Sequence, residues 1–186
     1  MSSEEGASLS EQLLDASRRN NDDLFETIVE SVGGNREKLA ALINGSHDPM
    51  GNTAFHLCCQ YGSWEVLDKI LDLDADLEVD PRNKRDGDTP LHVAVRYAVE
   101  EPEHGTFIAQ NLIEVGADPR IRNNNGQKPA DLIHGDELDD LFDLLQGAEL
   151  AADNGGVSAM EAQEAEVIED DDDDDDDVNE EAIDSK

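Results

Sequence analysis

Basic residues, cysteines, aromatic residues and long apolar runs are all scarce in this chain of 186 residues. Only 13 lysines and arginines stand against 47 aspartates and glutamates, and the formal net charge is −34. Such a chain repels phosphate, which argues against DNA or RNA as a direct ligand. The longest apolar run, residues 39–43, is too short for a membrane span or a signal-peptide core, and the first residues are acidic. We therefore expect no membrane segment and no secretory or mitochondrial address.

Cysteine is limited to two adjacent residues, Cys58 and Cys59. Neighbouring residues on a helix point in different directions, so a disulfide between these two would need distorted geometry. We interpret the pair as small packed residues in a protein of a reducing compartment, with redox or metal chemistry as the alternative.

Sequence signatures of catalysis are also missing. The chain has no glycine-rich phosphate loop, no Gly-x-Ser-x-Gly elbow and no His-Glu-x-x-His pair. Carboxylates are plentiful, but in so acidic a chain neighbouring pairs are expected by chance. The sequence therefore predicts a protein that is not an enzyme and that carries no cofactor and no metal site.

What the chain does contain is a repeated motif whose two glycines, Gly51 and Gly87, lie 36 positions apart. The glycines suit a turn conformation that a side chain would resist. A threonine and a histidine follow at equal spacing, as Thr53 and His56 in the first copy and Thr89 and His92 in the second. Each threonine can cap a helix, and Pro90 suits the first helical position. Each histidine can bond back to the turn and link neighbouring repeats, with a metal-binding or catalytic role as the alternative.

A repeat of this length built around Thr-Pro-Leu-His resembles the ankyrin repeat, a turn followed by two antiparallel helices. The resemblance implies an all-α solenoid of about four helix-turn-helix units with turn fingers. The two central units, residues 48–83 and 84–122, carry the motif. Weaker units flank them as an N-terminal cap over residues 9–47 and a C-terminal cap over residues 123–147, and residues 1–8 are expected to be disordered.

The connections and the caps depart from the repeat pattern. In the N-terminal cap, Asn20 stands where the inter-helix glycine belongs, and residues 36–43 can form an extra helical turn. The second central unit is longer than the first, and we place its extra residues in a polar inter-helix loop over residues 99–105. In the C-terminal cap, Lys128 and Asp131 replace the threonine and the histidine, which is typical of a terminal repeat.

Residues 148–186 differ in composition from the rest of the chain. They contain 17 acidic residues and one lysine, a net charge of −16, and no aromatic residue. Such a segment cannot bury enough apolar surface to offset its ordering entropy, so we expect a disordered acidic tail. Acidic blocks are commonly interaction tails, with a purely solubilising tail as the alternative. The most acidic part is a run of eight aspartates: Asp170, Asp171, Asp172, Asp173, Asp174, Asp175, Asp176 and Asp177.

The repeat region is acidic too, and this indicates the kind of partner. Residues 1–147 hold 30 acidic residues against 12 lysines and arginines. The long-range field of such a protein favours a basic protein partner, such as a ribosomal protein, a histone or a translation factor. We expect a monomer before the partner binds, located in the cytoplasm with the nucleus as a second location.

The resemblance also implies where a partner docks, because ankyrin arrays usually bind on their turn fingers and on exposed positions of each first helix. Tyr61 and Tyr97 stand at such first-helix positions, where the scaffold requires no aromatic residue, and Trp64 is a neighbouring candidate. Local packing is the alternative for all three. The matching finger positions are Met50, Asn52, Arg85, Asp86, Asp88, Asn124, Asn125 and Gln127, and the first-helix positions are Gln60, Tyr61, Arg96 and Tyr97.

Two classes of function follow. The first is an escort, or dedicated chaperone, that shields a newly made basic protein. A short ankyrin array with an acidic C-terminal tail resembles small fungal ankyrin-repeat proteins, some of which escort ribosomal proteins. The second is a regulatory adaptor or inhibitor that masks a site on a signalling or transcription protein.

Overall fold

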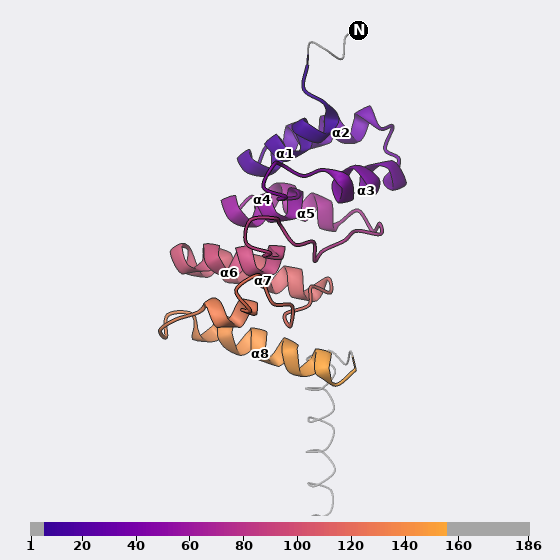
Figure 1. Ribbon diagram of the computed structural model, residues 1–186. Helices are drawn as coiled ribbons and strands as arrows, with labels where there is room; N and C mark the ends of the chain where they lie inside the picture. The colour runs from indigo at the N-terminus through magenta and orange to yellow at the C-terminus, as the bar shows by residue number, and fades with distance from the viewer. Residues whose placement is uncertain (1–5, 156–186) are drawn as a thin grey trace, which may run out of the picture. The chain divides into compact units, whose positions relative to one another are not determined.

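The computed structural model describes residues 6–155, and the chain divides into two compact units after residue 145. All regular structure among the described residues is helical (Figure 1), which confirms the expected all-α class. The elements are α1 (Leu9–Arg19), α2 (Asp22–Ser31), α3 (Arg36–Gly45), α4 (Ala54–Tyr61), α5 (Trp64–Leu71), α6 (Pro90–Glu100), α7 (Pro102–Glu114), the short 3-10 helix η2 (Pro129–Leu132) and α8 (Asp139–Asp153).

Helices pair along the chain, and the pairs stack on one another. α1 packs against α2, α4 against α5 and α6 against α7 (Figure 1). The first helices α1, α4 and α6 follow one another in a row, which η2 extends. Stacking buries one continuous apolar core, to which successive units contribute fully buried side chains such as Leu13, Phe55, Leu91 and Leu141.

The repeated motif starts the first helices of both central units, as predicted. The side chains of Thr53 and Thr89 cap α4 and α6. The ring of the histidine three residues later accepts a hydrogen bond from the backbone N–H of the same threonine. Pro90 is the first residue of α6. Asn20, the predicted substitute for glycine, ends α1 in the left-handed region with a φ of 55°. The predicted starts of α4 and α6 and the predicted left-handed end of α1 are therefore confirmed.

Each turn finger is bonded to the next one. The Asn124 N–H donates to the Asp86 carbonyl at 2.9 Å, and the Lys84 N–H donates to the Met50 carbonyl at 2.8 Å. Gly87 allows this approach, because its φ is +71° and a Cβ there would lie 2.9 Å from the Asn124 nitrogen. The glycines therefore serve both the turn itself and the contact between fingers.

The predicted polar loop over residues 99–105 was wrong. α6 continues to Glu100 and α7 begins at Pro102, so a single residue separates the two helices. The extra residues of this unit lengthen its helices to 11 and 13 residues, against eight in α4 and eight in α5. Gly105 permits the long pair to pack closely, because a Cβ there would lie 2.6 Å from the Ala98 nitrogen.

Both caps also differ in detail from the expectation. Residues 36–43 belong to the full ten-residue helix α3, which includes Gly45. The first helix of the C-terminal cap is reduced to η2, followed by Gly135 at a φ of +88°. α8 extends to Asp153, so the expected start of the tail at residue 148 lies inside a helix. This stretch is rich in alanine and leucine, which favour helix.

Candidate functional site

A groove with a volume of about 560 Å³ follows α4, α6 and the first two turn fingers. Nine of the thirteen residues predicted to contact a partner line it, so the fold brings together positions from both central units. We call this surface the finger groove. The nine residues are Met50, Asn52, Gln60, Tyr61, Arg85, Asp86, Asp88, Arg96 and Tyr97.

Several side chains in the finger groove are free to contact another molecule. Met50 is 51% exposed and Tyr61 is 50% exposed, although both are large and apolar. Arg85 is also exposed, and it makes no hydrogen bond or ion pair within residues 6–155. Exposed apolar side chains beside an unpaired cation are typical of a surface that a partner covers.

Asp88 differs from the other groove residues and does not have the contact role predicted for it. Its side chain is buried, and its carboxylate accepts hydrogen bonds from Arg96 Nε at 2.8 Å and from Asn123 Nδ2 at 2.9 Å. Its carbonyl accepts a bond from the His56 ring. Asp88 therefore holds the first helices and the fingers of adjacent units in register.

His56 and His92 link neighbouring units, as their spacing predicted. In each ring Nδ1 accepts the N–H of the capping threonine at 3.1 Å, so the proton is on Nε2. Nε2 donates to the carbonyl of Asp88 from His56 and to that of Gln127 from His92, both at 2.8 Å. Burial lowers the pKa of both rings. With both nitrogens engaged, neither ring is available as a metal ligand or a general base.

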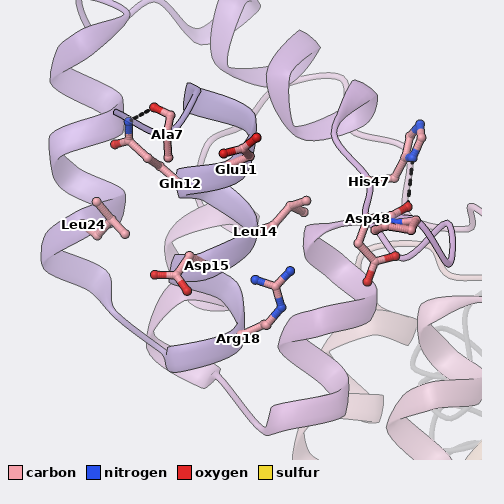
Figure 2. Close-up of a pocket in the computed structure, with 10 residues that line it drawn as sticks. Ala7, Glu11, Gln12, Leu14, Asp15, Arg18, Leu24, His47 and Asp48 are labelled. Carbon is pink, nitrogen blue, oxygen red and sulfur yellow. Dashed lines mark hydrogen bonds between the residues drawn. The ribbon is translucent and has the colours of Figure 1, made fainter. Parts of the chain in front are cut away.

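A second hollow continues the finger groove toward the N-terminus. It has a volume of about 510 Å³ and lies between α1, α2 and the turn after α3. Figure 2 shows Glu11, Asp15 and Arg18 on α1, with His47 and Asp48 on the turn. Arg18 and Asp48 line both hollows, so the two hollows together span the first helices α1, α4 and α6.

Arg18 was missed by the sequence reasoning, although a signal for it was present. It lies two residues before the left-handed Asn20, as Gln60 lies two residues before the left-handed Gly62. Arg96 follows His92 at the distance at which Gln60 follows His56. The three residues therefore occupy one repeating position of the array, and all three line the finger groove.

The finger groove is nearly balanced in charge, unlike the chain as a whole. Three arginines line it against four carboxylates. Two of these charges pair with each other, because Arg96 and Asp88 form an ion pair at 2.8 Å. The Asp48 carboxylate is used within its own finger, where it accepts the N–H groups of Met50 and Asn52 at 2.9 Å. The acidic excess of the protein therefore lies outside this groove.

The remaining predicted contact residues lie elsewhere. Trp64 starts α5 and packs against Phe107 of α7, with ring centroids 4.6 Å apart. Asn124 and Asn125 are exposed on the third finger, where Gln127 supplies the carbonyl that accepts the His92 bond. The eight aspartates at 170–177 lie outside the described residues.

Cys58 and Cys59 are free, fully buried thiols, in agreement with the packing interpretation. Burial raises the pKa of the Cys58 thiol to about 12 and raises that of Cys59 as well. Residues 6–155 contain no cluster of histidine, cysteine and carboxylate side chains able to hold a metal ion. Within the same range, no helix is long and apolar enough to cross a membrane.

Comparison with known proteins decides the family. The sequence pattern described as ankyrin repeats in three copies matches residues 13–123. The chain belongs to the ankyrin-repeat family. It is 68% identical over 165 residues to ankyrin repeat-containing protein YGL242C of Saccharomyces cerevisiae, a match that covers 89% of this chain and 91% of the relative.

Two other relatives match shorter parts of the chain. Protein phosphatase 1 regulatory subunit 27 of Mus musculus is 31% identical over 102 residues, which cover 55% of this chain and 60% of the relative. Oxysterol-binding protein-related protein 1 of Rattus norvegicus is 42% identical over 52 residues, or 28% of this chain and 5% of the relative. Ankyrin repeats are protein-interaction modules, and a protein partner is therefore indicated for this chain.

Proposed function

We propose that the protein is a non-enzymatic escort that holds a segment of a basic client protein in the finger groove. The observation that carries the proposal is the groove, where Met50 and Tyr61 are exposed beside Arg85, whose side chain has no partner within residues 6–155. The net charge of −34 supports a basic client, because a strongly acidic protein attracts basic proteins over long distances. The expected client is a ribosomal protein or a basic translation factor. The expected place of binding is the cytoplasm, with the nucleus as a second location.

The groove and the acidic charge contribute to binding in different ways. Buried aromatic side chains usually dominate such interfaces, at about 2 kcal/mol or more for a hot spot. Contacts between solvated charges are each worth little, and salt screens them over a Debye length of about 8 Å. The groove side chains should therefore set how long a client stays bound, and the acidic charge should set how fast it arrives.

A rate measurement on a captured client tests this division of roles. Tyr61→Ala and Tyr97→Ala should raise the dissociation rate at every salt concentration, whereas removal of residues 170–177 should slow association chiefly at low salt. Tyr61 gives the cleaner test, because Tyr97 also packs against His104. If the tail deletion abolishes binding and the tyrosine substitutions change nothing, the tail is the binding site and the groove is not.

A regulatory adaptor is the second candidate function. The similarity to a phosphatase regulatory subunit favours it, because that relative matches 102 residues of this chain. An adaptor would mask a site on a mature signalling or transcription protein instead of a new chain. An escort would bind a newly synthesised protein, whereas an adaptor would bind a mature one.

Pulse-labelled capture separates the two candidates. The full chain and its Tyr61→Ala and Arg85→Ala variants are used as bait, with Val115→Ala as a matched control. Val115 is exposed near the end of α7 and does not line the groove. An escort should capture one newly synthesised basic protein, and both groove variants should lose it while the control keeps it. Capture of an old, assembled complex would support the adaptor, and equal capture by all variants would exclude the groove.

A further inference from the structure

A row of aromatic rings covers the short turns that join the helices of the two central units. Trp64 of α5 packs edge-on against Phe107 of α7, with centroids 4.6 Å apart. Phe107 stacks against His104 at 6.5 Å, and His104 meets Tyr97 of α6 at 5.8 Å. His104 Nε2 also donates to the Gly62 carbonyl at 2.9 Å, which fixes the row over the neighbouring unit. We call Trp64, Tyr97, His104 and Phe107 the aromatic ridge.

Two of the four ridge residues lie on the long helix α7. His104 and Phe107 lie in the first two turns of α7, which is five residues longer than α5. Phe107 remains 43% exposed although its ring contacts Trp64 and His104, and Val99 on α6 is 56% exposed. The longer helices therefore present an apolar surface that the rest of the array leaves uncovered.

Three carboxylates lie along the chain between Tyr97 and His104. Glu100, Glu101 and Glu103 are all exposed and form no ion pair within residues 6–155, and no lysine or arginine occurs in residues 97–119. Burial raises the pKa of the Tyr97 hydroxyl, and the nearby carboxylates of Glu101 and Glu100 raise it further. The ridge thus combines the faces of aromatic rings with negative charge, whereas the finger groove is nearly balanced in charge.

The geometry points to the aromatic ridge as a surface for arginine side chains of a basic protein segment. A guanidinium stacks on aromatic rings and pairs with carboxylates, and it is less strongly hydrated than an ammonium group, so arginine should bind better than lysine. Tyr97 belongs to the ridge and also lines the finger groove, together with Glu100, so one segment can occupy both. The inference rests on the proposed function for its basic client and adds the chemistry by which that client is selected.

Trp64 is the single tryptophan of the chain, so its fluorescence reports on the ridge in the full-length protein. The probes are hexa-arginine and hexa-lysine peptides, titrated at an ionic strength of about 0.15 M. Hexa-arginine should change the Trp64 fluorescence and bind about fivefold more tightly than hexa-lysine. Phe107→Leu keeps an apolar side chain without a ring, so it should remove the preference for arginine and leave the hexa-lysine Kd unchanged. The unfolding temperature of the variant shows that it is folded.

The carboxylates are tested with two triple variants that remove the same charge. E100Q/E101Q/E103Q should weaken binding of both peptides, and E30Q/E37Q/D72N, on exposed positions elsewhere, should have little effect. Equal Kd values for the two peptides, an arginine preference retained by Phe107→Leu, equal weakening by both triple variants, or binding that leaves Trp64 fluorescence unchanged would each overturn the inference. Client capture that depends on Tyr61 would still stand in those cases. Arginine preference at the ridge without any captured client would instead refute the escort.

Discussion

The imidazole of His92 holds two units together through backbone groups, the Thr89 N–H and the Gln127 carbonyl. His92→Ala should lower the free energy of unfolding by about 1–3 kcal/mol, because the buried Thr89 N–H loses its acceptor. The Gln127 carbonyl retains the bond from the Asn123 N–H, so its loss adds less. Urea denaturation at pH 7.5 measures the change, and His134→Ala, at an exposed position, is the control.

The same substitution should cost less in acid. Burial lowers the folded-state pKa of His92, so the unfolded chain binds the proton more readily and acid destabilises the wild type. The variant has no ring to protonate there, and the difference in stability should narrow as the pH falls below about 6.5. A difference that stays constant between pH 7.5 and pH 5 would show that the neutral ring is not what the fold requires.

Asp80 is a carboxylate whose charge opposes folding. Burial raises its pKa to about 6, and the neighbouring Asp118 and Glu78 carboxylates add to the rise, although it accepts the Asp118 N–H at 3.2 Å. Stability should therefore decrease as the pH rises through about 6. Asp80→Asn should raise the free energy of unfolding at pH 7.5, because it removes this unfavourable charge. The gain should be about 1 kcal/mol, since solvent screens part of the repulsion at this half-buried site. The gain should vanish near pH 4 in thermal melts, for which Asp76→Asn, at an exposed position, is the matched control.

At the scale of the element, the pair formed by α6 and α7 depends on a glycine at their contact. Gly105→Ala should destabilise the protein by about 1–3 kcal/mol, because the new methyl group would overlap the α6 backbone at Ala98. Gly147→Ala, on α8, is the matched control. That site has nothing within 4 Å, so alanine should be neutral or stabilise slightly. Thermal unfolding of the two variants tests whether close helix contact, and not glycine flexibility, is what position 105 requires.

At the scale of the whole molecule, the chain carries a large excess of negative charge, with a net charge of −34. Residues 156–186 contain 15 acidic residues and one lysine, a net charge of −14. Deleting them should leave the unfolding temperature unchanged or raise it slightly, because repulsion from the acidic array is relieved. Starting the deletion at residue 156 keeps α8 complete, which a deletion from residue 148 would not do. Any stabilisation should disappear at high salt, and a deletion that unfolds the array would show that the segment supports it.

The sequence by itself determined the family and the helix starts, and the repeat identified His56 and His92 as the links between units. The helix starts depend on local chemistry, since a capping threonine, a histidine three residues later and a left-handed glycine act within one turn of chain. The positions Tyr61, Arg85 and Tyr97 could be placed on one face for the same reason, because a repeating unit puts equivalent residues at equivalent places. The same periodicity could also have identified Arg18.

Only the tertiary structure decided the use of residues whose environment comes from another unit. Asp88 looked like an exposed finger residue, but Asn123 of the next finger and Arg96 bury its carboxylate. Residues 99–105 looked like a polar loop because several of them are acidic. In the structure they continue the helices α6 and α7, which Gly105 allows to pack closely at Ala98. The contact between Phe107 and Trp64 was not foreseen, because it joins helices of two different units. These three contacts depend on distances across the stack, and the spacing of residues along the chain does not encode those distances.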